Sequence, residues 1–253
     1  MTQKKFAASV GTVVLGALAL SGFASQAQAD PVTATLAATY YEIANGAGAP
    51  DFGGSGTPNV ALGSSLGPDG LPVVSSSAPG VSLVNSSNEL EWWTPSSFVT
   101  QTSVAGATIS LPYASNMYPV NSTGGGDGSG FETAKFIGDF SLTSAAVVSF
   151  SLGSDDDSFI YVDGLLIGQN PGIHGVTNVT FDSPSLGKGN HSIEVFFADR
   201  EETGAFLSLS MVGDGVTITP PPAIPEPGSW ALLVAGLGAV GALSRRRRSA
   251  AQR

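Results

Sequence analysis

The chain contains no cysteine among its 253 residues. This absence excludes thiol nucleophiles, iron–sulfur clusters and thiolate zinc sites, and any exported domain must do without disulfides. Only two histidines, His174 and His191, are present, too few for most imidazole-rich metal sites. Stability must therefore come from a hydrophobic core, and about 190 residues between the two ends are enough for one sizeable β-sandwich.

Basic residues are almost absent from the body of the chain. Seven of the ten lie near its two ends, which leaves Lys135, Lys188 and Arg200 against twenty acidic residues. The body therefore carries a net charge of about −17. A surface of that charge repels nucleic acid and anionic lipid, so neither is an expected partner. It suits an exported protein, or one that gathers divalent cations.

A helical period is also nearly absent from the body, which is rich in Gly, Ser, Thr, Val and Pro. Short alternating runs predict an all-β fold, an antiparallel β-sandwich. The expected strands span residues 34–43, 107–111, 135–142, 146–152, 158–162, 191–198 and 205–212. In the last two, residues alternate along the strand, so each is expected to bury one face. Between residues 47 and 87 the composition predicts a long irregular connection.

The first 29 residues have the pattern of a signal peptide. Lys4 and Lys5 precede an apolar run, and Ala27-Gln28-Ala29 is a small-x-small cleavage pattern. Cleavage is therefore expected after Ala29, so that the mature chain begins near Asp30. An uncleaved membrane anchor is the alternative.

A three-part tail ends the sequence. Pro225-Glu226-Pro227 is followed by an apolar stretch at 230–243 and then by the arginines 245–248. Fourteen residues of helix span only about 21 Å, short of the roughly 30 Å hydrocarbon core. The order of the three parts resembles the PEP-CTERM sorting signal. That resemblance implies a short transmembrane helix that anchors the chain transiently in the inner membrane and processing by an exosortase-type sorting protease. It also implies export to the cell surface or extracellular matrix of an exopolysaccharide-producing Gram-negative bacterium.

The most informative internal feature is a run of three adjacent carboxylates, Asp155, Asp156 and Asp157, directly before a β-patterned segment. Three like charges in a row are unfavourable unless something positive lies among them. The Asp163-Gly164 turn closes the β-patterned segment, so the acids are expected in the loop between two strands. Such a loop is where a hard cation such as Ca²⁺ finds oxygen ligands. A solvated acidic loop tip without an ion is the alternative.

Several motifs occur in a fixed order around this loop. They are Tyr40-Tyr41-Glu42-Ile43, Pro50-Asp51-Phe52, the segment 153–164, Gly172-Ile173-His174-Gly175, the segment 189–200 and Gly204-Ala205-Phe206-Leu207. This order resembles fibro-slime domains, relatives of the protective-antigen-type carbohydrate-binding sandwich. The resemblance is best over residues 131–218 and weaker over 30–130.

Together with the two ends, this resemblance predicts the domain organisation. The expected parts are a signal peptide (1–29), the N-terminal part of the β domain with long Gly/Ser/Pro-rich loops (30–130), the sandwich core (131–218), a Pro-rich spacer with the Pro-Glu-Pro motif (219–229), and the sorting helix with its arginine cluster (230–248).

In the sugar-binding members of that superfamily, two consecutive aspartates joined by a cis peptide hold Ca²⁺, and the ion binds sugar hydroxyls. The register against the Asp163-Gly164 turn puts this pair on Asp155 and Asp156. The resemblance makes Asp157 a more distant or solvent-exposed residue. Lectin members also use an asparagine from a second loop, and Asp199 or Glu201 would replace it here.

The sequence therefore predicts a non-enzymatic, exported β-sandwich that binds a surface glycan or exopolysaccharide with the help of Ca²⁺. No residue is assigned a catalytic role. Trp92 and Trp93 are either a sugar-stacking platform or part of the core, since adjacent strand residues face opposite sides. A structural matrix component without ligand and an accessory module of a glycan-active system are the alternatives.

We expect the chain to be processed at both ends. The intact mass of the protein secreted by its native host should correspond to a chain that begins near Asp30 and lacks the arginine cluster. A secreted species that retains Met1 would contradict the first cleavage. One that retains residues 245–248 would contradict the second.

Overall fold

The computed structural model describes residues 32–44, 48–53, 59–75, 81–119, 130–201 and 203–219. The expected signal peptide with Ala29, the Pro225-Glu226-Pro227 motif and the expected sorting helix lie outside these residues. Within the described ranges, no helix is both long enough and apolar enough to cross a membrane.

Regular structure in the described chain is almost entirely β, which confirms the predicted fold class. The strands are β1 (Ala34–Ala44), β2 (Leu62–Leu66), β3 (Pro72–Val74), β4 (Val99–Gln101), β5 (Thr108–Leu111), β6 (Tyr113–Asn116), β7 (Gly130–Leu142), β8 (Ser149–Asp155), β9 (Asp157–Val162), β10 (Leu165–Asn170), β11 (Thr177–Asp182), β12 (Gly189–Ala198), β13 (Phe206–Val212) and β14 (Val216–Thr219). A short 3₁₀ turn, η1 (Glu91–Trp93), precedes β4. Each expected strand is present with somewhat different ends.

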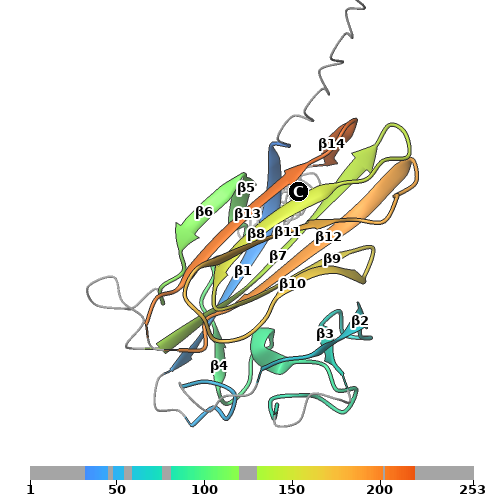
Figure 1. Ribbon diagram of the computed structural model, residues 1–253. Helices are drawn as coiled ribbons and strands as arrows, with labels where there is room; N and C mark the ends of the chain where they lie inside the picture. The colour runs from blue at the N-terminus through green and yellow to red at the C-terminus, as the bar shows by residue number, and fades with distance from the viewer. Residues whose placement is uncertain are drawn as a thin grey trace, which may run out of the picture.

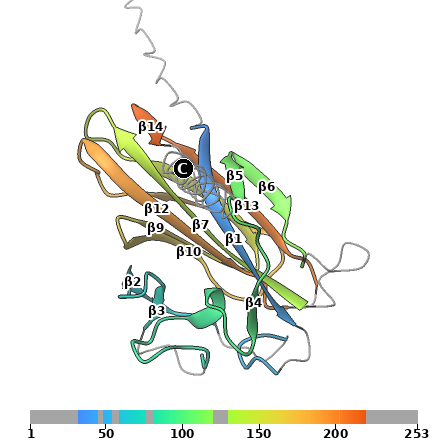
Figure 2. The same cartoon turned by 180° about the vertical axis from the view of Figure 1, so that it is seen from behind.

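The strands form two antiparallel sheets that pack as a sandwich (Figures 1 and 2). The larger sheet has the order β3-β2-β10-β9-β12-β7-β1-β4, with β14 also paired to β7 and β5 to β1. The smaller sheet has the order β11-β8-β13-β6. Because β1 and β6 belong to these two sheets, the sandwich is not confined to residues 131–218.

A first core fills the space between the two sheets. Phe136 and Phe197 from the larger sheet meet Phe150 and Leu207 from the smaller one, and all four are fully buried. The outer face of β13 carries half-buried serines, so this strand buries one face, as its alternation predicts.

A second core covers the other face of the larger sheet. Phe159 and Phe196 belong to it, and their rings contact Trp93 from the region before β4, which in turn contacts Trp92. This covering layer contains β2, β3 and η1, drawn in teal at the bottom of Figure 1. Two short strands therefore interrupt the connection that was expected to be irregular between residues 47 and 87.

Strand β12 thus buries both of its faces, which corrects the expectation of one buried face. Val195 and Phe197 point into the first core, whereas Phe196 points into the second. The covering layer is the physical reason that an aromatic residue stands where a one-sided strand would have a polar one.

We expect Phe196→Ala to cost about 3 to 5 kcal/mol of unfolding free energy, because its ring is fully buried in the second core. Ser210→Ala, on the outer face of β13, is the matched control and should stay within about 0.5 kcal/mol of the parent. Urea unfolding of the two variants measures both values. Similar small losses in both would mean that the second core contributes little.

Candidate functional site

The three consecutive aspartates lie where the chain passes from one sheet to the other. Strand β8 ends at Asp155 in the smaller sheet and β9 begins at Asp157 in the larger one, so Asp156 alone connects them. The peptide bond between Asp155 and Asp156 is cis, as the resemblance implied. The exposed fractions of the three residues are only 8%, 1% and 0%. The alternative of a solvated acidic loop tip is therefore wrong.

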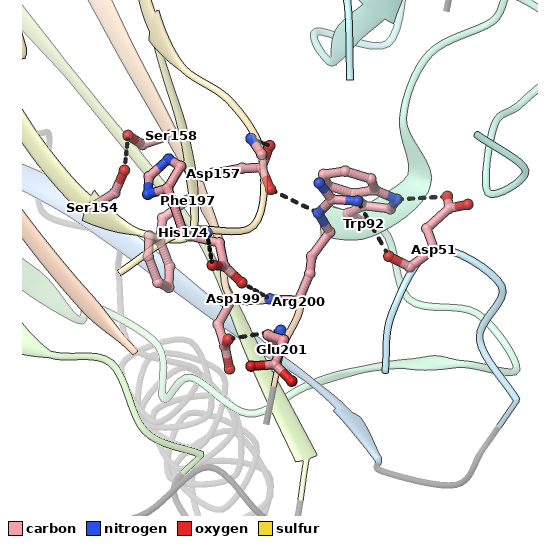
Figure 3. A network of polar contacts seen from close by, with 12 residues as sticks. Asp51, Trp92, Ser154, Asp157, Ser158, His174, Phe197, Asp199, Arg200 and Glu201 are labelled. Carbon is pink, nitrogen blue, oxygen red and sulfur yellow. Dashed lines mark hydrogen bonds and ion pairs between the residues drawn. The ribbon is translucent and has the colours of Figure 1, made fainter. Parts of the chain in front are cut away.

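Arg200 supplies the positive charge at this crossover. Its Nε atom lies 2.7 Å from Asp157 Oδ2, and both side chains are fully buried. The guanidinium lies over the Trp92 indole, 5.0 Å from the ring centroid, and Nη1 donates to the backbone carbonyl of Asp51 at 3.4 Å (Figure 3). Asp157 is thus an ion-pair partner in the interior, so of the two positions expected for it, distant from the ion or exposed to solvent, the exposed one is wrong.

Backbone N–H groups of two other loops donate hydrogen bonds to the carboxylates of Asp156 and Asp157. Asp156 Oδ1 accepts the His174 N–H at 2.8 Å and Oδ2 accepts the Arg200 N–H at 2.9 Å. Asp157 Oδ1 accepts the Gly172 N–H at 2.6 Å. Burial is the largest influence on the pKa of Asp156, which is raised on balance although its two backbone hydrogen bonds act to lower it. The Asp155 loop and the loop that begins at Asp199 therefore lie side by side.

The loop after β12 comes close to Asp155. Gly204 has a φ of 89°, and a Cβ atom there would lie 2.8 Å from Asp155 Oδ2, so a larger residue would be strained and would displace that carboxylate. In the same loop, the fully buried Asp199 accepts the Glu201 N–H through Oδ1 at 3.3 Å. Glu201 Oε2 accepts the Thr203 hydroxyl at 2.9 Å. The structure thus brings Asp199 and Asp155 to one end of the sandwich, while Glu201 binds within its own loop.

Both tryptophans are buried core residues, so they do not form a sugar-stacking platform. Trp92 Nε1 donates to Asp51 Oδ2 at 2.9 Å. The fully buried Asp51 carboxylate also accepts the backbone N–H groups of Ser82 and Leu83. Asp51 therefore joins Trp92 to the segment at Ser82 and Leu83 within the covering layer, and its carbonyl joins this layer to Arg200.

Sequence reasoning missed two glutamates at this end of the sandwich. Glu42 on β1 and Glu132 on β7 lie directly opposite each other in the larger sheet. Glu132 is only 2% exposed, and burial, followed by the nearby charge of Glu42, raises its pKa to about 9. Glu132 precedes the expected strand 135–142, and a charged residue there is typical of a surface position.

Asp155 and Asp156 fit Ca²⁺ in donor type, because carboxylate oxygens are ligands that this ion prefers. Both oxygens of Asp156 already accept a backbone N–H, and each retains a further lone pair. Within the described residues, no group of three or more His, Asp or Glu side chains is arranged to hold a metal ion. The remaining ligands would therefore be carbonyl oxygens, water or hydroxyl groups of a bound molecule.

Comparison with protein families gives a match at the C-terminus. Residues 223–248 match the PEP-CTERM protein-sorting motif. The chain carries a PEP-CTERM sorting signal. This confirms the resemblance of the tail and marks the chain as an exported substrate of a membrane-associated sorting system. A comparison with curated proteins finds no match. The fibro-slime resemblance of the body stays a prediction.

Solved structures give partial matches. The PA14 sugar-binding domain from an RTX adhesin is 25% identical, with 35% of this chain and 51% of that chain covered and a TM-score of 0.30. The PA14 domain of the MpAFP antifreeze protein is 18% identical, with 34% and 45% covered and a TM-score of 0.29. A family 35 carbohydrate-binding module from an environmental isolate is 20% identical, with 43% and 91% covered and a TM-score of 0.28. This chain thus spans about half the length of the first two, and at these TM-scores the matches assign no ligand to it.

We expect Arg200→Met to cost about 3 to 5 kcal/mol, because it leaves the buried Asp157 carboxylate without its ion-pair partner. The double variant Arg200→Met/Asp157→Asn removes both charges, so it should be less destabilised than the sum of the two single variants. A double-mutant cycle by urea unfolding measures this coupling. Additive losses would show that the two side chains do not interact appreciably.

Proposed function

We propose that this chain is a non-enzymatic, exported protein of the cell surface or extracellular matrix that binds a glycan through Ca²⁺ at the Asp155–Asp156 end of its sandwich. The PEP-CTERM signal supports export and processing by an exosortase-type protease. The observation that carries the binding proposal is the convergence of Asp155, Asp156 and the loop around Gly204 at one end of the two sheets.

The different contacts of the three aspartates support Asp155 and Asp156 as the cation ligands. Asp157 is committed to Arg200 and to the Gly172 N–H. Asp156 is held in place by two backbone amides, and Asp155 is the most exposed of the three. A bound Ca²⁺ would supply positive charge and open coordination positions, which suit the paired hydroxyl groups of a sugar. The fixed amides and the Arg200 ion pair would keep the carboxylates in position.

A ligand-free structural role in the matrix is the second candidate, and one observation favours it. Arg200 and three backbone amides already stabilise Asp156 and Asp157, so these carboxylates are held in place without a metal ion. In that case the acidic end would be an element of the fold alone. An accessory module of a glycan-active system would share the binding site and differ only in its partner.

Calcium should stabilise the full-length chain against thermal unfolding. At 100 times the dissociation constant the linkage is worth about 2.7 kcal/mol, or about 5 to 10 °C in Tm for a domain of this size. Magnesium should do less, since it demands octahedral geometry and dehydrates reluctantly. Asp155→Asn/Asp156→Asn should reduce the calcium shift, whereas Asp163→Asn, at the turn that closes β9, should keep it. A wild-type chain with no calcium-specific shift would contradict the proposed site.

A glycan array probed with and without chelator separates the two candidate functions. Glycan binding that disappears with chelator, and with Asp155→Asn/Asp156→Asn, is the expected result. Glycan binding that survives both would contradict the role of the ion. If the correctly folded chain binds no glycan on the array, the structural matrix role is favoured instead.

A further inference from the structure

A row of acidic residues crosses the end of the larger sheet. Glu42 on β1 faces Glu132 on β7 in direct register. Asp199 comes next, because its N–H donates to the Glu132 carbonyl at 2.9 Å. The following residue, Arg200, donates its N–H to Asp156, the residue before β9. Like charges that face each other on neighbouring strands repel, so Glu42 and Glu132 form an unfavourable pair whenever both are ionised.

Glu132 points into the interior of the sandwich. It shares a face of β7 with Ala134 and Phe136, which belong to the first core. Its side chain is 2% exposed, and Oε2 has no hydrogen-bond partner among the described residues. A buried carboxylate oxygen without a hydrogen-bond partner is costly, which is consistent with the raised pKa of Glu132. This orphaned oxygen needs either a proton or a cation.

The basic residues of the body form no described ion pair with Glu42 or Glu132. Lys135 pairs with Glu194 at 3.1 Å, and Arg200 pairs with Asp157. Lys188 is exposed in the connection between β11 and β12. Within the part of the chain that the structure describes, no ion pair joins Glu42 or Glu132 to a basic side chain. A proton on Glu132 or a mobile cation is therefore the remaining source of positive charge.

We propose that Glu42 and Glu132 form a second cation site, separate from Asp155 and Asp156, that holds a hard divalent cation of the Ca²⁺ class between β1 and β7. The two carboxylates provide the charge, and backbone carbonyls and water complete the oxygen coordination that Ca²⁺ accepts. A bound ion would contact both carboxylates, so that Glu42 and Glu132 would be linked through it and would no longer repel each other. The site thereby orders the same end of the sheet at which Asp156 lies, and it does not depend on glycan binding.

The test uses the full-length Asp155→Asn/Asp156→Asn chain, in which the first proposed site is removed. Equilibrium dialysis with Ca²⁺ at physiological salt should find one ion per chain. Adding Glu132→Gln or Glu42→Gln should raise Kd at least tenfold. Adding Asp139→Asn, which removes an exposed charge from the same strand β7, should leave Kd unchanged.

Thermal unfolding distinguishes lost ligands from a lost fold. In chelator, Glu132→Gln should melt several degrees above its parent, because one of two opposed carboxylates is gone. With saturating Ca²⁺ the order should reverse. The second site is overturned if the parent chain binds no Ca²⁺, or if the folded Glu42→Gln and Glu132→Gln variants bind it with unchanged Kd. Either result leaves the Asp155–Asp156 proposal untouched, since that proposal is tested by the opposite set of variants.

Discussion

The ion pair between Arg200 and Asp157 holds together the parts of this molecule that are far apart in sequence. It joins residues 43 positions apart, from the start of β9 and the end of β12, and both side chains are withdrawn from water. Through Trp92 and the Asp51 carbonyl, the same guanidinium reaches the covering layer. A buried pair of this kind adds little net stability compared with apolar side chains, but it penalises every arrangement that separates its members. Its contribution is therefore specificity of the fold.

A chain with so few basic residues must stabilise most of its buried carboxylates in another way, and it does so with backbone amides. Asp51 and Asp156 each accept two backbone N–H groups. Glu89 follows the same pattern: burial acts to raise its pKa, but hydrogen bonds from Asn85 and from the amides of Asp69 and Leu71 outweigh it and lower the pKa. Glu132 is the exception, because its Oε2 atom accepts no hydrogen bond within the described residues.

The sequence predicted those features that depend on local pattern. Strand β13 shows a regular alternation and buries one face as expected, and the aspartate run was identified because three adjacent like charges need an explanation. The covering layer was not predicted, since β2 and β3 are short strands in a Gly/Ser/Pro-rich region and carry little periodic signal.

The remaining misses share one cause, which is that burial depends on what packs against a residue. The two-sided burial of β12 required knowledge of the layer that covers Phe196. Arg200 has acidic neighbours in sequence, yet it pairs with Asp157 across the sheet. Glu132 resembles an ordinary surface position until its partner Glu42 and the core around it are placed.

The single-residue connection at Asp156 has a mechanical consequence. Since β8 and β9 belong to different sheets and are joined by one residue, the sheets cannot slide past each other at this end without displacing that residue. Its carboxylate is also fixed from two further loops. This end of the sandwich is therefore held in one arrangement, and a molecule that bound there would meet groups already in place, with little conformational entropy left to lose on association.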